Sequence, residues 1–293
     1  DKHPSDLLDK GHIDYIVREA IAAGADPILT LKVATHNAAR YFLMNNKGAL
    51  AGGYVADLII LDDLNSFDIA EVVKRGETVY RKGAEIELPS CLPDDNLTIK
   101  ATHSMHCRAL APEDFICGKK AVMGLIAGEI ITTDEGTADK ADVKADILKV
   151  AVIERHHNTG HIGLGYMKGY GLKKGAVATS IAHDSHNIIV VGADDESMAK
   201  AANAVIAAGG GIFVTDGVVT DGLPLPIAGL MSDGKLEDVN ELLEKTKARA
   251  YELGVNRGID PFMTLSFLSL PVIPALKLTS RGMFDVTKWK FVD

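Results

Sequence analysis

Residues 174–192, KGAVATSIAHDSHNIIVVG, place two histidines, an aspartate, a serine and an asparagine between two runs of apolar residues. The continuous β-branched run at 188–191 predicts a buried strand. Polar groups beside a buried strand need hydrogen-bond partners or a chemical role, because unpaired buried polar groups are costly. The chemistry open to His183, Asp184 and His186 is metal binding or proton transfer.

Two interpretations of this cluster follow from the residues alone. In the first, His183 and His186 bind a metal ion and Asp184 orients them. This requires a turn or bulge at Asp184-Ser185, because side chains three positions apart on a strand point to opposite faces. In the second, the cluster is a hydrogen-bonded turn in which Asp184 and Asn187 bond the nearby backbone.

A second group of polar residues, Glu154-Arg155-His156-His157, follows the apolar segment 147–154, which predicts a strand. Charged groups at a strand end either line a pocket or form an ion pair that caps the sheet, and we favour the ion pair. No G-x-S-x-G motif occurs, so no Ser/His/Asp triad is predicted. A series of glycines predicts a hairpin rather than a phosphate loop, because no helix start follows it: Gly163, Gly165, Gly169, Gly171 and Gly175.

The composition limits the possible partners. The 293 residues carry a formal net charge of −9 and no basic stripe with interleaved aromatic residues, so nucleic acid is not an expected partner. The most apolar stretch, 261–278, is interrupted by Pro271 and Pro274, contains Lys277 and is expected in the core rather than in a membrane. The cysteines are odd in number and lack CxxC spacing, which predicts a reducing, cytoplasmic location: Cys91, Cys107 and Cys117.

The elements expected to position these residues fall into two groups. The apolar residues from Ile13 to Ile21 have helical spacing, with Gly24 as the stop. Asp26-Pro27 is a typical start for a second helix, which Asn45-Asn46 ends. A glycine-rich turn then leads into a strand at 57–61, and 72–83 predicts a hairpin with Gly76 in its turn. The polar segment 85–96 marks the boundary before the last part of the chain.

The last part of the chain is expected to be an α/β layer. Segments 127–133 and 147–154 predict strands separated by a polar loop. A helix capped by Asp194 or Asp195 precedes a strand at 212–214, and strand, helix and strand in this order are typical of such a layer. Residues 235–253 predict an amphipathic helix that ends at Gly254.

Several of these segments carry a resemblance to a known family. The order DKHP, GHIDYIVREAIAAG, ADPILTLKVATHNAARYF and GALAGGYVADLIIL is similar to the tail of the amidohydrolase superfamily, including its G-x-(x)-x-G-x-x-A-D-[LI] motif. ERHHNTG, KKGAVATSIAHDSHNIIVVG, DGLPLPIAGLMSD and PFMTLSFLSLPVIPALKLT resemble the C-terminal domain that is specific to bacterial adenine deaminases. The resemblance covers almost the whole chain.

The resemblance implies a fold and a domain division. Residues 1–46 are expected to be the last helices of an amidohydrolase (β/α)8 barrel, and residues 47–95 part of a small β-sandwich. Residues 96–293 are expected to form a separate C-terminal α/β domain. Most of the metal-binding barrel would then be absent from this chain, since no His-x-His pair occurs in it.

The implied function is the hydrolytic deamination of adenine to hypoxanthine and ammonia. In the family, a pair of divalent metals, commonly iron or manganese, activates a hydroxide, and a carboxylate moves its proton to the departing amine. Asp1 is expected either to be the metal or substrate aspartate of the eighth barrel strand or to cap a helix. A third interpretation of His183, Asp184 and His186 is that they lean into the mouth of the barrel active site.

This interpretation predicts that the 293 residues alone are inactive and that the missing N-terminal barrel segment and a homo-oligomer are partners. An alternative is a structural or assembly module that braces the barrel or a neighbouring subunit, for which the apolar tail 262–278 would suit an interface. A further alternative is a self-contained metallohydrolase built on His156, His183, Asp184 and His186.

Overall fold

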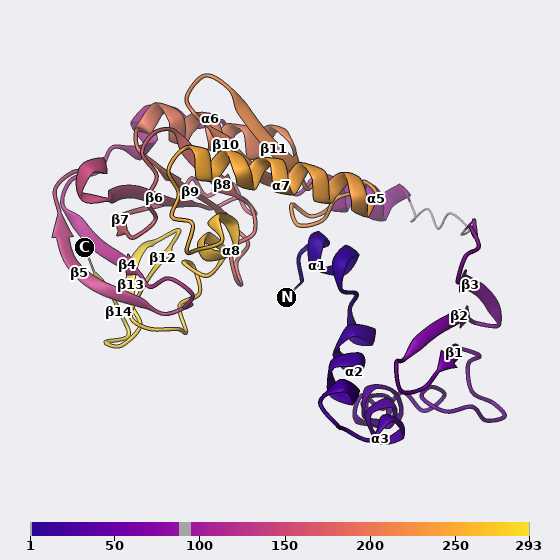
Figure 1. Cartoon of the computed structure of the whole chain (residues 1–293). Helices are drawn as coiled ribbons and strands as arrows, with labels where there is room; N and C mark the ends of the chain where they lie inside the picture. The colour runs from indigo at the N-terminus through magenta and orange to yellow at the C-terminus, as the bar shows by residue number, and fades with distance from the viewer. Residues whose placement is uncertain (1, 88–94, 293) are drawn as a thin grey trace. The chain divides into compact units, whose positions relative to one another are not determined.

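The structure, a computed structural model, describes residues 2–87 and 95–292 (Figure 1). These residues form two compact units, Asp1–Leu92 and Pro93–Asp293, called unit 1 and unit 2 below. Both helices and strands occur in each unit, so the chain is a mixed α/β protein with several sheets.

Unit 1 begins with short helices. Asp26 caps one of them, since its Oδ1 accepts the backbone N–H of Leu29 at 2.8 Å, and Pro27 occupies the first helical turn as predicted. The helix expected from Ile13 to Ile21 with its stop at Gly24 is confirmed, whereas the second helix ends at Tyr41 rather than at Asn45-Asn46. The helical segments are α1 (Pro4–Asp9), α2 (Ile13–Ala22), α3 (Pro27–Lys32), a π-helical turn (Val33–Asn37) and α4 (Ala38–Tyr41).

The sheet of unit 1 is antiparallel, with the order β1-β2-β3. Its strands are β1 (Leu58–Asp63), β2 (Asp68–Lys74) and β3 (Glu77–Arg81), which confirms the predicted strand and hairpin. Asp57 of the A-D-[LI] motif accepts hydrogen bonds from Lys47, Lys74 and the backbone of Arg75. The motif aspartate therefore ties the segment after the helices to the hairpin turn. The barrel-end and sandwich descriptions of unit 1 remain predictions.

Unit 2 is built on an eight-stranded sheet with the order β11-β10-β8-β9-β6-β7-β4-β5. All neighbouring pairs are antiparallel except β4 and β7, which are parallel. The strands are β4 (Lys120–Leu125), β5 (Thr132–Ala138), β6 (Ile147–Ile153), β7 (Ile162–Lys168), β8 (Ala176–Thr179), β9 (Ile188–Gly192), β10 (Gly211–Thr215) and β11 (Thr220–Pro224).

The central strands are buried on both faces, which explains their continuous apolar sequence. Successive residues of β9 alternate between two cores: Ile189 and Val191 pack with α7 and α8, whereas Ile188 and Val190 pack with α6. Figure 1 shows α7 as the long orange helix that runs along the sheet. The helices of unit 2 are α5 (Asp95–Thr102), α6 (Asp195–Ala207), α7 (Leu236–Glu252) and α8 (Pro261–Ser266).

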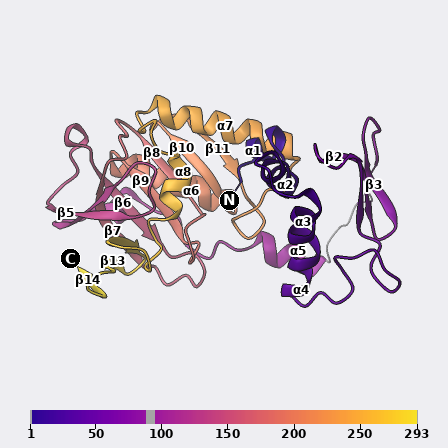
Figure 2. The same ribbon diagram turned by 60° about the horizontal axis from the view of Figure 1, so that its bottom comes forward.

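A second, three-stranded sheet packs against one end of the large sheet. Figure 2 shows its strands in yellow beside β5 and β7. Gly163 of β7 makes this packing possible, because a Cβ there would lie 1.9 Å from the carbonyl oxygen of Thr279. The hairpin predicted for the glycine series is wrong, because the two strands that flank Gly169–Gly175, β7 and β8, are not neighbours in the sheet. Gly163 is instead a point of close approach within a strand that pairs with β6. The strands are β12 (Leu276–Thr279), β13 (Gly282–Asp285) and β14 (Lys290–Val292).

One strand expected in unit 2 is displaced. Instead of a strand at 127–133, the structure has β5 at Thr132–Ala138. Gly128 lies in a turn with a φ of +80°, and pairing with β4 begins only at Thr132. The apolar stretch 261–278 is mostly core, as expected, since Phe262, Leu265 and Leu278 are buried, and this contradicts the alternative that it is a free interface. Within the described ranges, no helix is long and apolar enough to cross a membrane.

Candidate functional site

The turn between β8 and β9 carries the histidine and aspartate residues singled out by the sequence. The backbone N–H of His183 donates to the carbonyl of Ser266 at 2.8 Å, which fixes the turn against the end of α8. His186 has a φ of +49°, a turn conformation that few residues adopt. The rings of His183 and His186 lie edge to face, with their centres 5.5 Å apart. The structure therefore has the turn that His183 and His186 need in order to contact the same ligand.

The side chains of this turn differ in burial. His183 packs on Phe267 with ring centres 4.9 Å apart, whereas Asp184 and Ser185 are exposed. Burial, and to a smaller extent the nearby His183, lowers the pKa of His186 below its ordinary value. The lowered pKa favours the uncharged form of the His186 imidazole. Its Nδ1 accepts a long hydrogen bond of 3.4 Å from the backbone of Ala182.

Arg155 supports this turn from the interior. Its side chain is among the largest that are fully buried, and its Nε donates to the carbonyl of His186. Its other nitrogens donate to the carbonyls of Ser104 at 3.1 Å and Ala228 at 2.9 Å. Gly229 allows the guanidinium to lie close, because a Cβ there would be 3.0 Å from Arg155 Cζ. One guanidinium therefore joins three segments that are distant in the sequence.

The expected ion pair between Glu154 and Arg155 is wrong, because each group has other partners. The carboxylate of Glu154 accepts backbone N–H groups of His156, His157 and Thr159 at 2.6–3.1 Å. Burial raises the pKa of this carboxyl, but these hydrogen bonds outweigh it and bring the pKa to about 2. Glu154 thus organises the loop after β6.

His156 links that loop to the turn, since its Nε2 donates to the carbonyl of Ser185 at 2.7 Å. Four residues of the predicted cluster are therefore neighbours: His156, His183, Asp184 and His186. Among the residues that the structure describes, however, no group of three or more His, Cys, Asp or Glu side chains is arranged to hold a metal ion. The described residues alone do not fit the metal pair that the resemblance implies. Asp1 lies outside the described residues.

A groove of about 440 Å³ opens beside the turn. Asp184 and Ser185 form one wall, and the opposite walls come from the segment before β12 and from the β12–β13 turn. Sequence reasoning missed Ser269 and Arg281 of these walls: Ser269 stands in the segment 261–279, which was singled out only for its apolar character and its resemblance, and Arg281 lies outside the quoted segments. It singled out Arg155 only as part of a charged run and could not name its partners.

Most of unit 2, including the turn and the groove, lies in a segment that matches a known protein family. Residues 127–290 match the family model described as the adenine deaminase C-terminal domain. The chain belongs to this family. Residues 5–79 match the model of the amidohydrolase family, so both parts of the predicted resemblance are confirmed.

Curated relatives of the adenine deaminase family match the whole of this chain. "Adenine deaminase 2" of Carboxydothermus hydrogenoformans is 44% identical over all of the chain and 53% of the relative. "Adenine deaminase" of Desulfatibacillum aliphaticivorans is 43% identical, and that of Methanothrix thermoacetophila is 42% identical. Both matches cover 52% of the relative. The chain thus spans about half the length of the curated relatives it matches.

Proposed function

We propose that this chain serves the hydrolytic deamination of adenine to hypoxanthine and ammonia. The observation that carries this proposal is the 44% identity to a named adenine deaminase over the entire chain. The reaction needs an activated water, a proton carrier and groups that hold the purine. The turn places a half-buried imidazole, His186, beside the exposed carboxylate Asp184, and these two kinds of group can carry a proton and hold a purine.

We further propose that the reaction depends on a divalent metal pair, manganese or iron, whose ligands are not supplied by the described residues. When bound, such a pair provides a hydroxide at neutral pH. On this proposal the 293 residues alone release no ammonia from adenine, and activity requires the barrel segment in which the family carries its histidine ligands. A cytoplasmic location and a homo-oligomer are part of the same proposal.

A chimera tests this function. The matched half of the Carboxydothermus relative is replaced by this chain, and ammonia release from adenine is measured with Mn(II) or Fe(II). We expect activity from the chimera and from the intact relative but none from the 293 residues. A folded, metal-loaded chimera without turnover would count against the function, and turnover by the 293 residues alone would contradict their predicted inactivity.

A second candidate function, assembly, is favoured by the surface of unit 1. Large apolar side chains are exposed there, including Tyr41 at 81%, Leu43 at 79% and Leu50 at 83%. Such side chains are typical of a surface that packs against another part of a protein. Sedimentation at increasing concentration tests this candidate: self-association that Leu43→Ser weakens supports it, and a strict monomer that also fails to bind the remaining half of the relative contradicts it.

A further inference from the structure

Lys277 of β12 is completely buried, with 0% of its surface exposed. Its Nζ donates to the carbonyl of Ile130 at 2.8 Å and to the carbonyl of Phe267 at 3.1 Å. Within the described ranges, no carboxylate accepts a hydrogen bond from this nitrogen. A lysine is almost never fully buried unless it is paired with a charge, so the chemical state of this amine needs an explanation.

The two acceptors match an uncharged amine. Such an amine has two N–H groups, and each finds a carbonyl here. The ammonium form has three N–H groups, and among the described residues the third has no acceptor. The ammonium also carries a charge that an interior without water solvates poorly. Burial accordingly lowers the pKa of Lys277 to about 8.

The charged and titratable groups around Lys277 are exposed or engaged elsewhere. On the neighbouring strand β13, Asp285 pairs with Lys288 at 2.7 Å. At the start of α8, Asp260 pairs with Lys247 at 3.1 Å. The other groups of this kind on the loops and strands packed around β12 are exposed or in contact with different residues: Glu129, Asp134, Glu135, Lys149, Tyr166, Lys168, His183 and Arg281. None of these groups compensates an ammonium on Lys277.

The amine joins three segments that are far apart in the sequence. Ile130 lies just before β5, Phe267 directly follows α8, and Lys277 itself lies on β12. Backbone hydrogen bonds link the same segments: the N–H of Thr132 donates to Pro274 at 3.0 Å, and that of Leu278 donates to Leu268 at 2.9 Å. The residues that accept from the amine also line a cavity of about 220 Å³. The state of the amine therefore bears on this junction and on the cavity wall.

We infer that Lys277 is a buried proton switch, in which loss of the ammonium proton to solvent tightens the junction of β12, α8 and the segment before β5. Without that proton, both N–H groups are hydrogen-bonded and no charge remains in the interior. With it, one N–H is unpaired and the charge is poorly solvated, so the junction is weaker. The inference does not depend on the proposed function, because it involves neither a metal nor adenine.

Nuclear magnetic resonance of the 293-residue chain with ¹³C-labelled lysine tests the protonation step directly. The Lys277 Cε signal is assigned through its proximity to Ile130 and Phe267 and followed from pH 6 to pH 11. We expect a midpoint near pH 8. The Lys288 signal should titrate above about pH 10, because its pairing with Asp285 raises its pKa. A Lys277 midpoint above about pH 10 would overturn the inference.

Urea denaturation of the wild type and of Lys277→Met tests the effect on the fold. The unfolded chain binds a proton at Lys277 up to about pH 10.5, whereas the folded chain releases it from about pH 8, so stability rises with pH between these values. Relative to Lys277→Met, the unfolding equilibrium constant of the wild type should fall about tenfold between pH 7 and pH 9. Trp289, the one tryptophan of the chain, reports this transition by its fluorescence because it lies in unit 2.

Lys288→Met is the matched control, because Lys288 lies on the adjoining hairpin and is 60% exposed on its side chain. Its effect on stability should be the same at pH 7 and at pH 9. Amide hydrogen exchange locates the change: the N–H groups of Thr132 and Leu278 should become better protected as the pH rises in the wild type but not in Lys277→Met. A difference between the wild type and Lys277→Met that stays constant with pH would overturn the switch. Should Lys277→Met fail to fold, the wild-type midpoint and the exchange of these two amides decide the question.

Discussion

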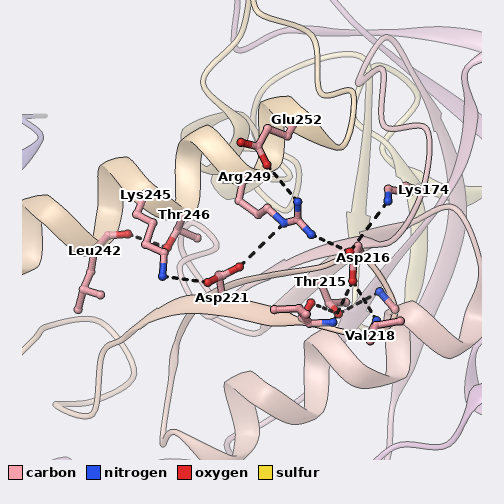
Figure 3. A network of polar contacts seen from close by, with 12 residues as sticks. Lys174, Thr215, Asp216, Val218, Asp221, Leu242, Lys245, Thr246, Arg249 and Glu252 are labelled. Atoms are coloured by element: carbon pink, nitrogen blue, oxygen red, sulfur yellow. Dashed lines mark hydrogen bonds and ion pairs between the residues drawn. The ribbon is translucent and has the colours of Figure 1, made fainter.

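Asp57 in unit 1 and Asp216 in unit 2 have nearly the same surroundings. Asp57 accepts a backbone N–H and two lysine ammonium groups, and the hydrogen bond from Lys47 is the main reason that its pKa is low. Asp216 accepts the backbone N–H groups of Val218 and Val219, which lower its pKa to about 2, and it pairs with Arg249 at 2.7 Å (Figure 3). Each carboxylate fastens a hairpin turn to a neighbouring segment.

The difference lies in the apolar surface beneath these contacts. In the described part of unit 1, the buried hydrophobic side chains are Val17, Ala39 and Phe67. Unit 2 has two packed clusters, one on each face of its large sheet. Surface ion pairs contribute about 0–1 kcal/mol each, whereas a buried leucine or phenylalanine contributes about 1.5–3 kcal/mol. The two units therefore have similar networks of charged side chains, but only unit 2 also has a hydrophobic core large enough to stabilise it alone.

Separating the units at the 92/93 boundary tests this contrast most directly. Residues 93–293 alone should unfold cooperatively, with a melting temperature within about 5 °C of that of the whole chain. Residues 1–92 alone should show no cooperative transition, because three buried side chains cannot offset the entropy of ordering a unit of this size. Circular dichroism and calorimetry measure both. A sharp transition for residues 1–92 would break the comparison.

Arg155→Ala should be the most damaging single change in unit 2. It leaves the carbonyls of Ser104, His186 and Ala228 without their shared donor and removes a large buried side chain. We expect the free energy of unfolding to fall by about 3–4 kcal/mol, measured by urea denaturation. Arg108→Ala is the matched control, because Arg108 pairs with Asp114 at an exposed position, and it should cost about 0.5 kcal/mol.

Glu154→Gln should cost less than Arg155→Ala, and its cost should depend on pH. The folded pKa of Glu154, about 2, is below the ordinary value of 4.5, so the stabilisation is complete above about pH 4.5 and is lost as the pH falls toward 2. We expect a loss of about 2 kcal/mol at pH 6 that shrinks by pH 3. Urea denaturation of both proteins across this range measures it. A loss that stays constant with pH would show that the ionised carboxylate is not what holds the loop.

The sequence predicted the elements whose signals are local. The β-branched run at 188–191 and the capping aspartate predicted β9 and α6. The backbone N–H of Ser197, in the first turn of α6, donates to Asp194 Oδ1 at 2.7 Å. Strand β5, Thr132–Ala138, was missed because it is a polar strand at the edge of the sheet, with mostly exposed side chains, and its pairing with β4 is not encoded locally. Polarity alone made it look like a loop.

For the candidate site, too, the sequence predicted only the features that have a local signal. The HDSHN pattern indicated a turn before a buried strand, and the structure has that turn. The partners of Arg155 are 31–73 positions away, and Ser269 is notable only because its hydroxyl is unpaired in the fold. Such features depend on tertiary packing, so residue type and spacing cannot reveal them.

Arg249→Ala is the smallest effect that still bears on the contrast between the units. Arg249 on α7 is 24% exposed and contacts Asp216 and Glu252 (Figure 3), so we expect a loss of about 1 kcal/mol that decreases in 1 M salt. Lys245→Ala, which breaks a pair with Asp221 at a 68% exposed position on the same helix, should change stability by less than about 0.5 kcal/mol. Urea denaturation at low and high salt distinguishes the two. If Arg249→Ala cost as much as Arg155→Ala, surface ion pairs would stabilise unit 2 as strongly as its buried side chains do. The small number of buried side chains in unit 1 would then no longer predict that residues 1–92 alone lack a cooperative transition.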